Sequence, residues 1–137
     1  MPVYASSDQL YSVLQTLFSS ISERNPAAAR TVSNSKLILR MRTSAPVTEV
    51  CFNGRQNPLQ VHYGASPLRP DIELELPADL LHGILLNQIT MRKAYSTGKI
   101  KLRGPLWRAF VLEDIFHAGQ AIYPQIVRDQ NIDGFKA

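Results

Sequence analysis

The sequence predicts an α+β fold built on a five-stranded mixed sheet that is mainly antiparallel. Apolar residues recur at helical spacing near the start of the chain, and the period then changes to two through its middle. A further alternation of strands and helices follows from about residue 71. The length of 137 residues, with 45% hydrophobic and 19% charged residues, is typical of one globular domain, which we expect to span residues 1–137.

Two helices are predicted at the start of the chain. In residues 6–22, apolar residues recur every three or four positions, so that they share one helix face. Ser6 and Gln9 have the spacing of a capping box, which favours a helix start at this point. Asn25 before Pro26 is typical of an N-cap followed by a first-turn proline, and this pair predicts a short second helix.

Three strands of an antiparallel meander are predicted next, over residues 36–43, 47–52 and 59–63. Their residues alternate between the two faces of a sheet, and short polar segments separate them. Asn53 and Gly54 favour the positive backbone angles of a tight turn after the second strand.

The second half of the chain predicts two more strands and further helices. Residues 71–76 alternate acidic and aliphatic side chains, as in a strand with one solvated face. The helix expected over residues 78–89 is apolar around more of its circumference than one buried stripe requires. A fifth strand is predicted over residues 99–103, before a helical stretch from Pro105 to about Gln130. We expect a crossover helix to join the last two strands, a connection that makes them parallel by the usual handedness rule, unless a longer excursion of the chain reverses the direction.

The segment 91–104 contains five basic residues and no acidic one. It does not fit a phosphate-binding loop, because the first glycine and the metal-binding hydroxyl of that motif are missing. If the last two strands are neighbours, their charged faces largely cancel, with Asp71, Glu73 and Glu75 set against Lys99, Lys101 and Arg103. Arg92, Lys93 and Arg108 then remain for an anionic head group or membrane surface. No nucleic acid is expected, because the sequence lacks the known DNA- and RNA-binding patterns.

No catalytic residue, metal site or cofactor is predicted. His62, His82 and His117 are scattered without the spacing of metal ligands, and there is no nucleophile elbow. Cys51 is the only cysteine, which fits a reducing compartment, and its place in a strand predicts a small buried hydrophobe. The chain has neither a span-length apolar stretch nor the pattern of a signal peptide, so we expect a cytoplasmic protein.

The order "DIELELPADLLHGIL" then "MRKAYSTGKIKLRGPLWRAF" resembles the sterol carrier protein 2 (SCP-2) family of lipid-transfer domains. The resemblance covers residues 36–116. That family has an acidic alternating strand, a helix and a segment of the type K-A-x-x-S/T-G-K-[LI]-K-[LIV]-x-G, matched here by Lys93, Ala94, Thr97, Gly98, Lys99, Ile100, Lys101, Leu102 and Gly104. The resemblance implies helices on one face of the sheet, an apolar tunnel, and non-catalytic binding or transfer of a fatty acid, acyl-CoA, sterol or isoprenoid-type lipid.

We expect the tunnel between the helix over residues 78–89, the helical stretch after Pro105 and the apolar face of the fifth strand. A helix that is apolar on more than one side favours such a cavity, although a filled core has the same pattern. The expected lining residues are Leu81, Ile84, Leu85, Ile89, Ile100, Leu102, Leu106, Phe110, Ile115 and Phe116. Arg92 and Lys93 are expected at the mouth, where they would meet an acidic head group.

Two other classes of function stay open. The same apolar groove fits a helix of a partner protein or a second copy of the chain, which describes an accessory or dimerising domain without a lipid ligand. A small hydrolase or a nucleic-acid binder is the third class, and no motif in the sequence supports it.

Overall fold

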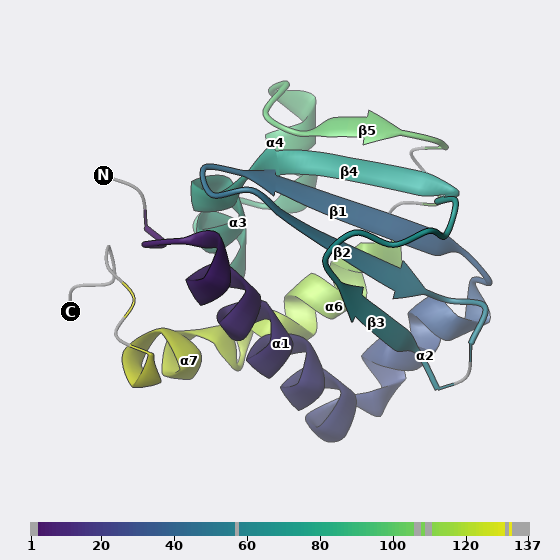
Figure 1. Ribbon diagram of the computed structural model, residues 1–137, viewed down its shortest axis with the longest axis horizontal. Helices are drawn as coiled ribbons and strands as arrows, with labels where there is room; N and C mark the ends of the chain where they lie inside the picture. Colours follow the sequence, from purple (N-terminus) through teal and green to yellow (C-terminus); the bar gives the residue numbers. More distant parts are fainter. Residues whose placement is uncertain (1–2, 57, 106–107, 109–110, 131, 133–137) are drawn as a thin grey trace.

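The computed structural model describes residues 3–56, 58–105, 108, 111–130 and 132. It has the predicted α+β architecture, with a five-stranded sheet and helices packed against one face of it (Figure 1). The elements in chain order are α1 (Ser7–Arg24), α2 (Pro26–Asn34), β1 (Ile38–Ser44), β2 (Thr48–Asn53), β3 (Gln60–Tyr63), β4 (Ile72–Pro77), α3 (Ala78–Leu85), α4 (Met91–Ser96), β5 (Lys101–Arg103), α6 (Val111–Gln120) and α7 (Tyr123–Asp129). Within the described residues, no helix has both the length and the apolar character needed to cross a bilayer.

The first two helices begin at the caps that the sequence predicts. The Ser6 hydroxyl accepts a hydrogen bond from the Gln9 N–H at 3.1 Å. The Asn25 side chain accepts one from the Ala28 N–H at 3.3 Å, with Pro26 in the first turn. Each cap satisfies an N–H group that has no partner inside its helix, which fixes where the helix starts.

The sheet has the strand order β3-β2-β1-β4-β5. The antiparallel meander of β1, β2 and β3 is confirmed, and β1 pairs with β4 in parallel. β5 is antiparallel to β4, so the simple crossover is wrong and the longer excursion is the one that occurs. The reason is visible in Figure 1, where α3 and α4 stay at the end of the sheet where β4 finishes and β5 runs back from there.

The helix predicted over residues 78–89 ends earlier than expected. α3 finishes at Leu85, and Asn87 adopts a left-handed backbone conformation with φ of 60°. The Asn87 N–H bonds to the Ile84 carbonyl, and the Gln88 N–H bonds to the Gly83 carbonyl at 2.9 Å. This is a Schellman-type stop with asparagine in place of glycine, and it overrides the apolar pattern that continues to Ile89.

The core lies between the sheet and the helices. Its largest buried side chains include Phe52 of β2 and Leu39 of β1, and the rings of Phe18 and Phe52 meet edge to face with centroids 5.0 Å apart. Cys51 is also buried, as predicted, and burial raises the pKa of its thiol. A buried thiol with a raised pKa is a poor nucleophile, which agrees with a packing role for this residue.

Glycine is needed at position 54 because the backbone of another segment lies very close to it, and not because of a positive backbone angle. Its backbone angle is not positive, so the prediction of a positive-φ turn at this glycine is wrong. A Cβ atom here would lie 2.4 Å from the Leu37 carbonyl oxygen and 2.5 Å from that of Val32. The Gly54 N–H also donates to the Leu37 carbonyl at 2.8 Å. The glycine therefore allows β2 to approach the start of β1 closely.

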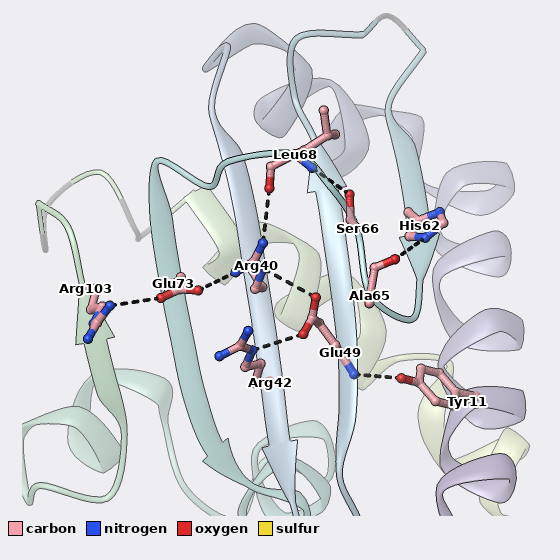
Figure 2. A network of polar contacts seen from close by, with 10 residues as sticks. All are labelled: Tyr11, Arg40, Arg42, Glu49, His62, Ala65, Ser66, Leu68, Glu73 and Arg103. Atoms are coloured by element: carbon pink, nitrogen blue, oxygen red, sulfur yellow. Dashed lines mark hydrogen bonds and ion pairs between the residues drawn. The ribbon is translucent and has the colours of Figure 1, made fainter.

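The face of the sheet opposite the helices carries a polar network (Figure 2). Arg40 lies at its centre, with its guanidinium 2.7 Å from the Glu73 carboxylate and donating to the Leu68 carbonyl at 3.1 Å. Glu73 also faces Arg103 at 3.7 Å, which confirms opposite charges across β4 and β5. Asp71 lies outside this pairing, because the antiparallel register places it beyond the end of β5, and it binds Arg55 instead.

Candidate ligand-binding cleft

A cleft of about 270 Å³ lies where the end of α3, the start of α4 and α6 meet. Ile84 and Phe116 line it, with side chains that are only 2% and 3% exposed. The complete set of lining residues is Ile84, Asn87, Thr90, Met91, Arg92, Glu113, Phe116, His117 and Gln120. The cleft therefore has apolar walls from three helices and a polar rim.

Two local signals turn the chain so that α4 borders this cleft. Asn87 stops α3, and the Thr90 hydroxyl then caps α4 by accepting from the Lys93 N–H at 3.1 Å. Met91 and Arg92, at the start of α4, are thereby placed at the cleft. Both Asn and Thr favour these positions because of their local hydrogen bonding and backbone preferences.

The walls of the cleft are joined by two polar contacts. The Arg92 Nε lies 2.7 Å from a Glu113 carboxylate oxygen, which links α4 to α6 at the rim. The Gln120 side chain donates to the Ile84 carbonyl at 3.0 Å, which links the end of α6 to α3. The carbonyl of Ile84 near the end of α3 thus gains a second hydrogen bond, and the relative position of the two helices is fixed.

The predicted lining residues fall into three groups. Ile84, Phe116 and the head-group residue Arg92 border the cleft. The others that are described do not border it: Leu81, Leu85, Ile100 and Ile115 are buried in the core, Ile89 and Leu102 are partly buried against it, and Lys93 is exposed on α4. Leu106 and Phe110 lie outside the described residues. A role in binding stays a prediction for all of them.

Sequence reasoning missed most of the polar rim. Glu113, His117 and Gln120 follow one another at helical spacing on α6, and this spacing was available as a signal that they share a face. Nothing in the sequence indicates that this face meets Arg92, because the contact depends on how α4 and α6 pack. Met91 was also missed, since one methionine at a helix start has no distinctive pattern.

A second polar cluster lies in the interior, away from this cleft. The His82 Nδ1 is 2.6 Å from the Tyr123 hydroxyl, which in turn is hydrogen-bonded to the hydroxyl of Tyr4. Burial lowers the pKa of His82, and the nearby Asp79 acts in the opposite direction. Among the described residues no group of three or more His, Cys, Asp or Glu side chains is arranged to hold a metal ion. The cluster therefore joins α3, α7 and the N-terminal segment through neutral hydrogen bonds.

Comparison with solved structures identifies the fold of this chain. No protein-family model and no curated protein matches the sequence. The structure of sterol carrier protein 2 from Yarrowia lipolytica in its apo form superimposes with a TM-score of 0.62 at 20% identity, over 88% of this chain and 98% of the other. The chain has the SCP-2 fold.

Other structures share this SCP-2 fold. A palmitated form of SCP2L2 from Aedes aegypti matches with a TM-score of 0.54 at 20% identity, over 77% of this chain and 91% of that one. A protein described as "UbiJ-SCP2 Ubiquinone synthesis protein" matches with a TM-score of 0.56 at 16% identity, over 82% of this chain and 89% of the other. The fold predicted from the resemblance over residues 36–116 is therefore confirmed.

Proposed function

We propose that this protein binds or transfers a hydrophobic ligand, without catalysis, in the cleft between α3, α4 and α6. The observation that carries the proposal is the composition of this cleft, with Ile84, Met91 and Phe116 on its walls and Arg92 on its rim. Apolar walls with a few polar groups at one end are typical of sites that bury a greasy ligand and orient its head. The SCP-2 fold supports this choice, since proteins named as sterol carriers and one palmitated protein share it.

The ligand that fits best has a narrow apolar chain and an acidic head group. The cleft volume of about 270 Å³ is slightly below the roughly 300–1,000 Å³ that is usual for small-molecule sites. A long chain therefore requires the lining side chains to change rotamer, which Met91 does easily because its side chain is unbranched. Fatty acids, acyl-CoA and isoprenoid-type lipids meet this description more closely than a rigid sterol.

The alternative is an accessory or dimerising domain without a lipid. Such a domain usually presents a broad apolar surface, but among the described residues the only large exposed hydrophobic side chains are Val47 and Tyr95. The lipid proposal is therefore preferred. A homodimer, contact with an anionic membrane during ligand exchange, and a cytoplasmic location stay predictions.

Met91→Glu tests the ligand site. The substitution keeps the length of the side chain, and an acid is compatible with the first turn of a helix. It places a carboxylate in the wall of the cleft, where an apolar chain would have to desolvate it. We expect the affinity for a fluorescent fatty acid, followed by titration, to fall at least about tenfold.

The matched control is Val47→Glu, which adds the same charge at a side chain that is 69% exposed and lies outside the cleft. It should bind the fatty acid as the wild type does. Equal affinities for wild type and a folded Met91→Glu, checked by circular dichroism, would contradict binding in this cleft. A stable dimer or a co-purifying protein with no lipid binding would favour the alternative.

A further inference from the structure

The positive charge of this protein is concentrated in one segment. Of the 15 basic and 11 acidic residues, six basic and none of the acidic ones fall between residues 80 and 112. The remaining residues carry nine basic and 11 acidic side chains, so the net charge of +4 arises entirely from this segment. Such segregation of charge creates a local field that a uniform distribution would not produce.

The structure places three lysines of this segment on one edge of the molecule. Lys93 belongs to α4, Lys99 follows the turn after α4, and Lys101 belongs to the edge strand β5. Figure 1 shows α4 and β5 together at this edge. All three side chains are exposed, and none has an ion pair with an acidic residue of the described chain.

An exposed aromatic side chain lies on the same helix as Lys93. Tyr95, on α4, is 38% exposed and is one of the two large hydrophobic side chains that are exposed among the residues described. An exposed tyrosine on a helix that also carries a lysine is typical of a surface that meets the head-group region of a bilayer, where the ring is partly buried and the hydroxyl stays hydrated. Lysines add attraction to anionic lipids.

The same helix also borders the ligand cleft. Met91 and Arg92 of α4 line the cleft, and Lys93 and Tyr95 follow them directly. A ligand with a long apolar chain is poorly soluble in water, so its transfer is favoured when the mouth of the site lies against the membrane that holds it. The position of α4, which borders the cleft and carries Lys93 and Tyr95, meets this requirement.

We propose that Lys93, Tyr95, Lys99 and Lys101 form a docking surface, here named the basic edge, for an anionic membrane. This inference rests on the proposed lipid function, because the membrane is the source or destination of the ligand. The charge is complementary to anionic head groups, and the exposed tyrosine favours a bilayer over a nucleic acid, whose binding proteins read single strands with clusters of stacking aromatics.

Sedimentation with lipid vesicles tests the basic edge. The wild type should bind vesicles of phosphatidylcholine with about 30% phosphatidylserine at low salt and should not bind pure phosphatidylcholine. In the triple variant Lys93→Gln, Lys99→Gln, Lys101→Gln, each lost charge lowers binding about fivefold, so the combined loss is on the order of a hundredfold. Added salt should weaken wild-type binding in the same direction.

The control variant Arg24→Gln, Arg30→Gln, Lys36→Gln removes three exposed positive charges from α1, α2 and the turn between α2 and β1. It has the same net charge as the test variant and should still bind the anionic vesicles. Equal losses in the two variants would show that only net charge matters and would overturn the docking surface. Binding of the wild type to a DNA duplex but not to vesicles would overturn it as well.

Fluorescent fatty-acid titration in solution, without vesicles, separates this inference from the proposed function. The double variant Lys99→Gln, Lys101→Gln should bind the fatty acid like the wild type, because neither lysine lines the cleft. If neither protein binds the fatty acid, the proposed function fails. If both bind it but vesicle binding does not depend on the three lysines, only the basic edge fails.

Discussion

Arg92 and Glu113 form an ion pair at the rim of the proposed ligand cleft. Their ion pair joins α4 to α6, yet the Arg92 side chain is 64% exposed. Exposed ion pairs contribute little to stability, typically about 0–1 kcal/mol, because water competes for both partners. A ligand carboxylate can therefore replace Glu113 at Arg92 without a large loss of folding free energy.

Glu113→Gln should raise the affinity for a fatty acid by about three- to tenfold. The substitution removes the carboxylate that competes for Arg92 and repels the acidic head, while the shape of the side chain is kept. The affinity for the fatty alcohol of the same chain length should not change.

Arg92→Gln should lower the affinity for the fatty acid and leave the affinity for the fatty alcohol unchanged. Parallel changes for acid and alcohol in competition titrations would contradict a head-group role for this pair.

His82 shows the limit of sequence reasoning at the residue scale. Its ring is hydrogen-bonded to Tyr123 of α7 and meets the ring of Tyr4 edge to face, and Asp79 of its own helix acts on its charge. Tyr4 and Tyr123 are 119 positions apart, and no local pattern predicts that they meet. The sequence could show only that histidine spacing does not fit a metal site.

The pH dependence of stability follows from His82. Burial lowers its pKa in the folded state, with Asp79 opposing, so the unfolded chain binds more protons below the ordinary histidine pKa of about 6.5. The stabilising effect of neutral His82 is complete above that pH and is lost as the pH falls toward the folded-state pKa. Thermal melting between about pH 7 and pH 5 should show a falling melting temperature.

His82→Gln keeps a side chain that can hydrogen-bond to Tyr123 but does not titrate. Its melting temperature should depend less on pH over the same range than that of the wild type. Identical pH profiles for the two proteins would show that the other titrating groups, and not His82, cause the acid loss of stability.

At the scale of elements, prediction succeeded where a local pattern decides the structure. Period-two alternation identified all five strands, and the caps Ser6 and Asn25 marked two helix starts. The end of α3 was predicted incorrectly because the apolar pattern continues past a stop set by backbone hydrogen bonds at Asn87. The direction of β5 depends on where the intervening helices pack, and sequence spacing allowed both directions.

Gly54→Ala should destabilise the meander. The new methyl group would meet two carbonyl oxygens that belong to the backbone and cannot move aside. Overpacking of this kind typically costs about 1–3 kcal/mol of unfolding free energy, which urea denaturation measures.

Gly83→Ala is the matched control for Gly54→Ala. Gly83 lies within α3, and a Cβ there meets its nearest neighbours at 3.6 Å, which is ordinary contact. Alanine is the better helix former, so this variant should be more stable by about 0.5–1 kcal/mol. A Gly54→Ala protein as stable as the wild type would mean that β2 does not approach the start of β1 in the way described.

At the scale of the whole molecule, the fold separates two polar environments. The sheet face opposite the helices holds opposite charges that pair with one another around Arg40 (Figure 2). The edge formed by α4 and β5 carries lysines without acidic partners among the described residues. The sequence predicted the pairing of opposite charges on this face correctly in part. It overestimated the pairing at the edge, because Lys99 lies before the start of β5 and only Lys101 lies opposite an acidic residue, Glu75.

The central claim is that a lipid binds in the cleft between α3, α4 and α6. Two-dimensional amide NMR of the isotope-labelled protein during titration with palmitate tests it most directly, because each residue reports its own surroundings. We predict saturable shifts concentrated at Ile84, Met91, Arg92 and Phe116, with little change around Arg40 on the opposite face. Unchanged spectra at saturating palmitate, or shifts confined to that opposite face, would contradict the claim.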